Sequence, residues 1–238
     1  MRAKLNFKSS IPQAARPRIV RRHPTGAKER VDFVLARRVV GYRLFDEAGE
    51  LTYDCGLRGG RPHGVAYRLD QPGKVLSATP YKGGLEHGLA KQWSSDGQRL
   101  IGSYRMRNGT GVDLWWQETF TDPPRPYLAE VRFVLRGQLH GFEWWLNADQ
   151  RSVYEERHWR YGKQHGIERA WNRKGRLRRG FPRFFVAGER VSRRAYERAQ
   201  ADEQSLPKPR PADDNNRRAF PPEVARRLTA ALGPRSRP

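Results

Sequence analysis

Between residues 39 and 188 short runs of large apolar side chains alternate with polar turn sequences. Four of these turns open with Asp, Asn or Ser and close with Gly: Asp46–Gly49, Asp70–Gly73, Ser94–Gly97 and Asn172–Gly175. A short polar side chain caps such a turn, and glycine adopts the positive φ that returns the chain. The alternation therefore predicts β-hairpins. Because a single hairpin is marginally stable in water, we expect several hairpins to lie side by side.

A second glycine-rich turn repeats through the same region. Its closing glycines stand at 64, 88, 111, 141 and 166, and in four cases a histidine precedes the glycine: His63-Gly64, His87-Gly88, His140-Gly141 and His165-Gly166. A period in this range is typical of repeat units that gain stability only by stacking on their neighbours. The sequence thus predicts a mainly β fold over 39–188, a single-layer solenoid of stacked antiparallel β-hairpins.

The repeated unit resembles a known family. The stretch from Gly84 to Leu100 has Gly-x-x-His-Gly, an aromatic residue five positions later and a further turn glycine, and the stretch from Gly162 to Leu177 has the same features. This arrangement is similar to the variant form of the MORN repeat, and the likeness covers about 42–180. The resemblance implies a β-hairpin scaffold for protein binding, with antitoxin-like or membrane-adjacent roles, including phospholipid contact.

The two ends of the chain differ from the repeats. Residues 1–38 are rich in arginine and proline and predict a disordered basic arm. Residues 189–205 predict a helix that caps the open end of the repeats, with Ser192 as its N-cap. Residues 206–238 predict a Pro/Arg-rich tail that includes a short helix from Pro221 to Leu232.

The net charge of +22 is concentrated at these ends. Residues 1–38 contain 11 basic and 2 acidic residues, residues 39–155 contain 14 of each, and residues 156–238 contain 22 and 9. Arg16, Arg18, Arg21 and Arg22 make up the basic patch of the first arm. Two interpretations stay open. The ends bind nucleic acid or anionic lipid, or the 38 arginines against 9 lysines reflect a compositional bias.

Alternation within the strands suggests a binding surface. Side chains at odd positions after each closing glycine, such as Tyr67, Trp93 and Trp144, are mostly apolar and are expected to line the packed face. The even positions are mostly small or polar, with the exceptions Trp115 and Trp145. These two are flanked by Asp113 and Glu143. We therefore expect Trp115, Trp145, Asp113 and Glu143 to form an exposed platform for a partner with apolar and basic groups, unless the terminal helix or the Pro-rich loop 121–126 covers it.

The sequence offers no catalytic centre, cofactor site or metal site. Equivalent histidines of adjacent hairpins would lie roughly 10 Å apart, which is too far to share one zinc ion. We expect these histidines to hydrogen-bond turn backbone. The single Cys55 is read as a strand residue, with a reactive thiol as the alternative.

The leading interpretation is a non-catalytic scaffold that binds a protein partner, and the alternative is nucleic-acid or anionic-lipid binding through the basic termini. No stretch is apolar enough for a transmembrane segment. We expect a cytoplasmic protein, and organelle targeting by the first arm stays open as an alternative. The sequence does not determine the oligomeric state. A further hypothesis is that the basic arms dock on the acidic and aromatic face.

Overall fold

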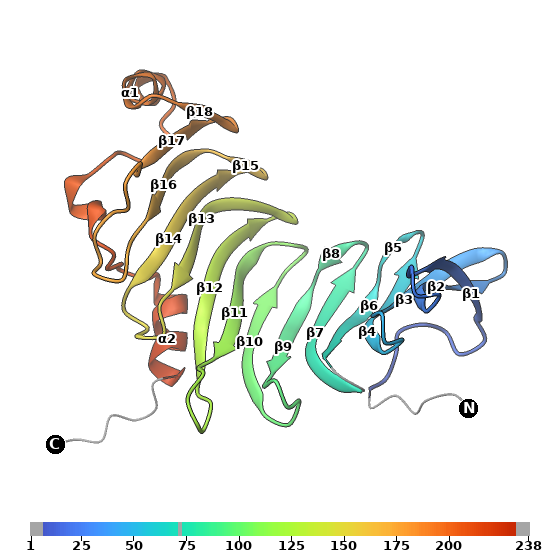
Figure 1. Ribbon diagram of the computed structural model, residues 1–238. Coiled ribbons are helices and arrows are strands. Elements are labelled where there is room, and N and C mark those ends of the chain that lie inside the picture. Colours follow the sequence, from blue (N-terminus) through green and yellow to red (C-terminus); the bar gives the residue numbers. More distant parts are fainter. Residues whose placement is uncertain (1–6, 71–72, 232–238) are drawn as a thin grey trace. The chain divides into compact units, whose positions relative to one another are not determined.

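The computed structural model describes residues 7–70 and 73–231, which form mainly β-strands (Figure 1). The chain divides into two compact units, the first ending at Thr110 and the second beginning at Gly111. Each unit contains one antiparallel sheet. The predicted mainly β class with hairpins and a short C-terminal helix is confirmed. In the part of the chain that is described, no helix has the length and apolar character needed to span a membrane.

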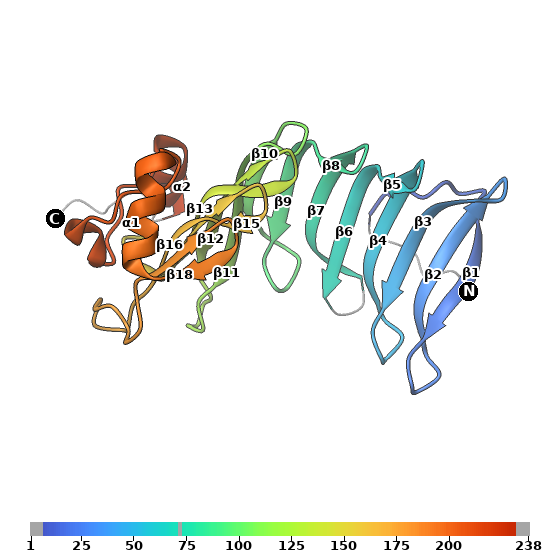
Figure 2. The same cartoon turned by 90° about the horizontal axis from the view of Figure 1, so that it is seen from above.

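The strands of the first sheet pair in chain order, as Figure 2 shows. Two short strands, β5 and β8, pair with β4 and β7 at the ends of hairpins. The strands are β1 Arg16–Arg22, β2 Lys28–Leu35, β3 Arg38–Phe45, β4 Leu51–Arg58, β5 Arg61–Pro62, β6 Gly64–Asp70, β7 Lys74–Lys82, β8 Leu85–Glu86, β9 Gly88–Trp93 and β10 Leu100–Met106.

The second sheet also follows the chain, and three helical segments come after it. Its strands are β11 Gly111–Glu118, β12 Pro126–Leu135, β13 Gln138–Leu146, β14 Val153–Arg160, β15 Lys163–Gln164, β16 Gly166–Ala170, β17 Arg183–Val186 and β18 Glu189–Val191. The helical segments are α1 Arg193–Asp202, the short 3-10 helix η1 Pro211–Asp214 and α2 Pro222–Ala231.

Two kinds of turn connect the strands. At one end the turns are short, and both central residues have positive φ, which is the φ signature of the type I′ turn that suits strand twist. These pairs are Ala36-Arg37, Gly59-Gly60, Gly83-Gly84, Asn108-Gly109, Arg136-Gly137, Tyr161-Gly162 and Ala187-Gly188. At the other end lie the predicted Asp/Asn/Ser-to-Gly turns. There the Gly49 amide donates to the Asp46 carbonyl (3.0 Å), and the Glu50 amide donates to Asp46 Oδ1 (2.8 Å).

The first arm is not a disordered segment throughout, as the sequence had predicted for 1–38. Residues 16–22 and 28–35 form β1 and β2, and residues 1–6 lie outside the described part. The prediction was wrong here because the next hairpin, β2–β3, lacks the two usual signals: its turn is Ala36-Arg37, without a glycine, and Val40-Gly41 replaces His-Gly in β3. The signal that was available is the similarity of Phe33-Val34-Leu35 and Gly41 to Phe133-Val134-Leu135 and Gly141.

Strand register defines two faces on each sheet, since residues directly opposite on paired strands point to the same side. In the first sheet one side carries Asp54, Tyr67, Ala78 and Lys91 at neighbouring positions. In the second sheet one side carries Val131, Trp144, Glu156 and Arg169. These sides are called face 1 of each sheet, and the opposite sides are called face 2.

The N-terminal segment 7–15 crosses face 1 of the first sheet. Ser9 Oγ donates to Asp54 Oδ1 at 2.7 Å, and the Asp54 carboxylate, which is fully buried, also accepts a hydrogen bond from Arg43 Nε. Ile11 is 8% exposed and packs on Gly41, where an added Cβ would come within 2.5 Å of the Ile11 side chain. Glycine at 41 therefore allows the segment to approach the sheet.

Helix α1 begins after Ser192, whose Oγ accepts a hydrogen bond from the Ala195 amide at 3.2 Å, as predicted. Tyr196 of this helix is completely buried, in a cluster with Ile167, Phe184 and Leu206. The helix is shorter than the predicted 189–205, because Glu189–Val191 continues the sheet as β18. It lies against β17, where Figure 1 also places it, and covers the last strands of the second sheet.

The described part of the tail, up to residue 231, packs on face 1 of the second sheet, and residues 232–238, which include the predicted helix end at Leu232, lie outside the described part. Trp171 Nε1 donates to the Asp214 carbonyl at 2.7 Å, and the Phe220 ring lies edge-on to Trp144 with ring centres 5.5 Å apart. The predicted short helix is present as α2, which contacts β12, and its Val224 is fully buried. The tail is therefore part of the core of the second unit.

A buried carboxylate fixes the tail. Glu156 is 3% exposed and accepts hydrogen bonds from Arg218 Nε (2.6 Å), Arg169 Nη1 (2.7 Å) and Trp144 Nε1 (2.8 Å). Burial alone would raise the pKa of Glu156, but the hydrogen bond from Arg218 and the nearby positive charges lower this pKa to about 2. Glu156 is therefore ionised and tied to the tail through Arg218.

Replacing Ile11 should loosen the first unit. Ile11→Ala removes a buried side chain and should lower the local unfolding free energy of β3 and β4 by about 2–4 kcal/mol. The matched substitution Ile19→Ala, at a side chain that is 46% exposed, should change it by less than about 0.5 kcal/mol. Hydrogen exchange of the β3 and β4 amides measures both, and equal effects would contradict a packed 7–15 segment.

Replacing Arg218 should release the tail. Arg218→Ala leaves Glu156 buried with one partner fewer and should cost about 3 kcal/mol of unfolding free energy. Arg217→Ala, at the exposed neighbouring residue, is the control and should have little effect. Urea unfolding followed by tryptophan fluorescence tests this, and a stable Arg218→Ala protein with its tail still protected from protease would be the contrary result.

Candidate functional site

The residues predicted to form an exposed aromatic platform are not arranged that way. Asp113 is 6% exposed and accepts a hydrogen bond from Arg132 Nε at 2.6 Å. Glu143 is 4% exposed and accepts one from Trp159 Nε1 at 2.7 Å. Burial raises the pKa of Glu143, and the Trp159 hydrogen bond opposes this shift. Both carboxylates thus have partners within the sheet.

Trp115 and Trp145 do lie on one face, as the alternation predicted, but both are only partly exposed. The Arg157 guanidinium sits over the Trp145 ring, 4.8 Å from its centre. The prediction did not take into account that an arginine side chain on the neighbouring strand covers the Trp145 ring. Because a long side chain on β14 reaches across to β13, alternation along one strand could not reveal this coverage.

Face 2 of the second sheet carries a row of charges that alternate in sign from strand to strand. The row runs, on β11, β12, β13, β14, β16 and β17 in turn, through Asp113, Arg132, Glu143, Arg157, Glu168 and Arg183. Arg157 Nε donates to Glu168 Oε1 at 3.1 Å, and Arg183 Nη1 lies 3.5 Å from the other oxygen of Glu168. This row stabilises the sheet and neutralises the carboxylates that a basic partner would need.

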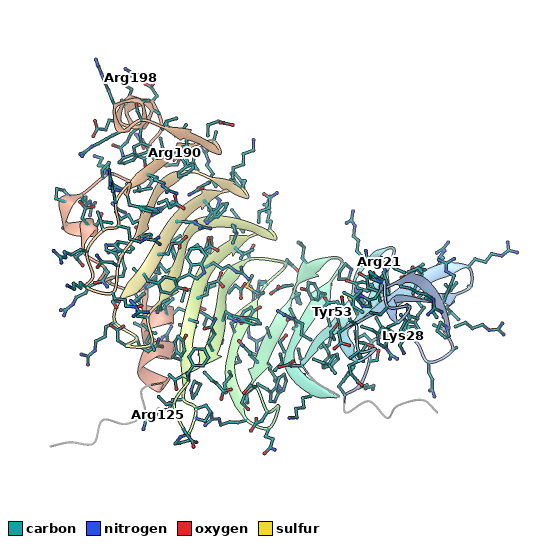
Figure 3. The ribbon with its side chains drawn as sticks, in the orientation of Figure 1. Arg21, Lys28, Tyr53, Arg125, Arg190 and Arg198 are labelled. Atoms are coloured by element: carbon teal, nitrogen blue, oxygen red, sulfur yellow. The ribbon has the colours of Figure 1, made fainter. Side chains whose placement is uncertain are left out.

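The predicted basic patch lies on β1, the edge strand of the first sheet. All seven residues of β1 are exposed, including Arg16, Arg18, Arg21 and Arg22. Arg21 pairs with Glu29 at 2.6 Å and Arg18 lies 3.9 Å from Asp32, so part of the positive charge is neutralised by β2. Figure 3 shows Arg21 and Lys28 at this end of the first sheet.

Three of the four turn histidines accept hydrogen bonds from backbone, as expected of them. His87 Nδ1 accepts from the Asn108 amide at 3.2 Å, His140 Nδ1 from the Tyr161 amide at 3.4 Å and His165 Nδ1 from the Ala187 amide at 3.1 Å. In each case the donor belongs to the next positive-φ turn, so the imidazole links neighbouring hairpins. His63 differs, because its Nδ1 is buried without a hydrogen-bond partner.

The glycines that follow these histidines have the backbone geometry that excludes most side chains. Gly64, Gly88, Gly141 and Gly166 have φ values of 83°, 122°, 74° and 134°. At Gly64 an added Cβ would also lie 2.4 Å from Ser10 Oγ of the N-terminal segment. The closing glycine thus serves both the turn and the approach of a distant part of the chain.

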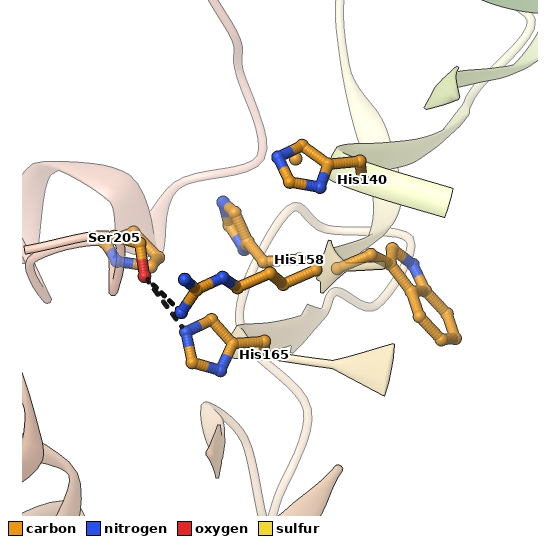
Figure 4. A pocket seen from close by; sticks show the side chains of 8 residues that line it. His140, His158, His165 and Ser205 are labelled. Carbon is orange, nitrogen blue, oxygen red and sulfur yellow. Dashed lines mark hydrogen bonds between the residues drawn. The ribbon is translucent and has the colours of Figure 1, made fainter. Parts of the chain in front are cut away.

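One small cavity, of about 110 Å³, gathers three histidines in the second unit (Figure 4). His140, His158 and His165 line it together with Arg160 and Ser205. Over the described ranges, no group of three His, Cys, Asp or Glu side chains is placed to hold a metal ion. The cavity therefore gives no support to a metal centre.

The same cavity contains a Ser–His pair with the wrong polarity for a nucleophile. His165 Nε2 lies 3.2 Å from Ser205 Oγ, and His165 Nδ1 accepts the Ala187 amide proton. In a neutral imidazole the other nitrogen then carries the hydrogen, so Nε2 donates to Ser205 and cannot take its proton. Ser205 Oγ donates in turn to Glu203. This arrangement anchors the end of α1.

A larger groove lies on face 1 of the first sheet. It measures about 630 Å³ and is lined by Phe7, Val65, Tyr67, Gly73, Lys74, Val75, Ala78, Pro80, Leu89, Lys91, Trp93, Asp96 and Gly97. Phe7, the first described residue of the N-terminal segment, borders the groove and packs against Tyr67 with ring centres 4.2 Å apart. Leu89 is 40% exposed within it. The groove thus presents an apolar surface to solvent.

The corresponding face of the second sheet is buried. Trp144 is 8% and Trp171 4% exposed, because the tail segment 211–231 lies over them. The expectation that odd positions line a packed face therefore holds in the second unit only. In the first unit Ala66 and Ala90, at even positions, are buried, whereas Leu69 is the one buried side chain among the odd positions of β6 and β9. The difference arises because, among the described residues, no chain segment covers face 1 of the first sheet at β7 and β9.

Stability of the second unit should fall as the pH is lowered from about 7.5 through 6.5. Burial lowers the pKa of His158 and of His165 below the usual 6.5, and Arg160 lowers that of His165 further. Because the unfolded chain then binds more protons than the folded one, acid favours unfolding. Tryptophan fluorescence reports this unit, since six of the seven Trp belong to it. His158→Gln/His165→Gln should flatten the profile, and an unchanged profile would exclude these two residues as its cause.

Comparison with known proteins yields no match to any family model and no match to a curated protein.

Proposed function

We propose that this chain is a non-catalytic repeat protein of the MORN-like type, a solenoid of stacked hairpins, that binds a protein partner through the groove on face 1 of its first sheet. The observation that carries the proposal is the open apolar surface around Tyr67, Leu89 and Trp93. An exposed apolar surface bordered by charged side chains is a common feature of protein-binding sites. The second unit supports the same view, because its equivalent face is covered.

Two features of the groove suit protein recognition. Tyr67 and Trp93 offer large ring surfaces, which are enriched among residues that dominate binding energy. The surrounding aliphatic side chains, Val65, Val75 and Leu89, provide shape rather than directed hydrogen bonds. These features favour an apolar polypeptide segment over a small polar substrate.

A second candidate function rests on β1. Its exposed Arg16, Arg18 and Arg22 form a positive edge to which nucleic acid or anionic lipid would bind. The C-terminal basic segment contributes less to this function than its composition indicates. Arg218, for example, is committed to Glu156.

Leu89→Arg should abolish partner capture, because it places a charge in the middle of the apolar groove. Leu100→Arg, a matched substitution at a leucine that is 52% exposed outside the groove, should leave capture intact. The full chain is used as bait, bound proteins are identified by mass spectrometry, and direct binding is then measured with the purified partner. The partner's identity also separates antitoxin-like from membrane-adjacent roles.

An Arg16→Gln/Arg18→Gln/Arg22→Gln variant in the same experiment tests the second candidate. Loss of captured nucleic acid or lipid in this variant, together with steep loss at raised salt, would support binding through β1. Capture that is unaffected by Leu89→Arg would contradict the proposal for the groove.

A further inference from the structure

We propose that the groove on face 1 of the first sheet receives an acidic amphipathic helix of a partner protein. This inference rests on the proposed function and adds the chemistry of the bound segment. Two observations support it: the charges around the groove, and the manner in which the tail covers face 1 of the second sheet.

The floor of the groove is apolar and the cations stand around it. Lys74 and Lys91 line the groove and are exposed. Arg105 on β10 is exposed as well, and it pairs directly with Leu89, so it points to the same face. A partner that brings apolar side chains to Leu89 therefore meets positive charge on both sides of it.

One acidic residue, Asp96, also lines the groove and offsets part of this charge, since it interacts with Lys74. Asp96 Oδ1 accepts hydrogen bonds from Ser94 Oγ (2.5 Å) and from the Gln98 amide (3.0 Å), and these contacts lower its pKa. Its carboxylate is thus directed to its own turn. The balance around the floor is three cations to one turn-bound acid, which favours an acidic ligand.

The second unit shows how a face of this kind is covered. There the tail places the Phe220 ring edge-on to Trp144, and α2 then buries Val224 and Leu228 on one side of the helix. These apolar residues are four apart, as on one face of an amphipathic helix. A helix with this spacing is therefore a suitable shape for the open groove, where Trp93 occupies the same repeat position as Trp171.

The tail of a second copy of this chain fits the groove less well. The tail is basic, with Arg210, Arg217, Arg218 and Arg226, and would face the lysines of the groove with like charge. Arg218 is also held by Glu156 within its own unit. Charge thus favours an acidic partner over self-association.

Nucleic acid would pair its phosphates with the lysines, but it would not match the apolar floor of the groove. Single strands bind proteins by stacking bases on successive rings. The groove instead places Val65, Val75 and Leu89 among its rings. Aliphatic side chains of this kind favour the apolar face of a helix.

The test uses the full chain and two labelled peptides of about 15 residues with apolar side chains at i, i+3, i+4 and i+7. One peptide has Glu at most of the other positions and the second has Lys there. Fluorescence anisotropy at low salt should show the acidic peptide binding at least about tenfold more tightly. Raised salt should weaken this preference.

Charge reversal supplies the matched control. Lys74→Glu/Lys91→Glu should remove or invert the preference for the acidic peptide. Lys163→Glu/Lys174→Glu, at two exposed lysines of the second unit, changes the net charge equally and should preserve it. Leu89→Arg should abolish binding of the acidic peptide.

The outcomes separate this inference from the proposed function. If neither peptide binds, or both bind equally, while Leu89→Arg still abolishes capture of a protein partner, the inference is wrong and the groove remains a binding site. If capture does not depend on Leu89, the proposed function fails. Two further results would contradict the proposal of an acidic helix. One is dimer formation that Leu89→Arg prevents. The other is tighter binding of a single-stranded oligonucleotide that Lys74→Glu/Lys91→Glu abolishes.

Discussion

Each described unit of this protein holds a single sheet, and a single sheet has two faces that the same strands cannot both bury. Chain from outside the hairpins has to cover the remaining apolar area. In the first unit residues 7–15 do so by packing Ile11 on Gly41 and Phe7 on Tyr67. In the second unit the tail does so, with Val224 and Phe220 over β12 and Trp144. The stability of both units therefore depends on the segments at the two ends of the sequence.

The same constraint accounts for the groove. Within the described ranges the N-terminal segment reaches β6, and apolar side chains on β7 and β9 beyond it stay partly exposed, Leu89 most clearly at 40%. An incompletely covered face is a natural docking surface, since a partner only has to supply the missing layer. In the second unit that layer is supplied by the chain itself, which makes its mode of packing a guide to what the first unit accepts.

The large positive charge has several distinct uses. Arg132, Arg157 and Arg183 alternate with carboxylates on face 2 of the second sheet, where long side chains also cover neighbouring rings. Arg218 fixes the tail on Glu156. The arginines of β1 are among those left largely to solvent. Net charge alone thus overstates how much of the molecule is available to a polyanion.

The sequence by itself determined the local structure. Asp46 and Gly49 specify a turn, Ser192 begins a helix, and the alternation of apolar residues gives strands, because each of these depends on backbone and side chains a few positions apart. The β2–β3 hairpin escaped prediction because its turn residues, Ala36 and Arg37, have positive φ although neither is a glycine. Only the tertiary structure decided which faces are covered. Phe7 meets Tyr67 and Arg218 meets Glu156 across about 60 residues of chain, so no local pattern could place the groove or show that Trp145 lies beneath Arg157.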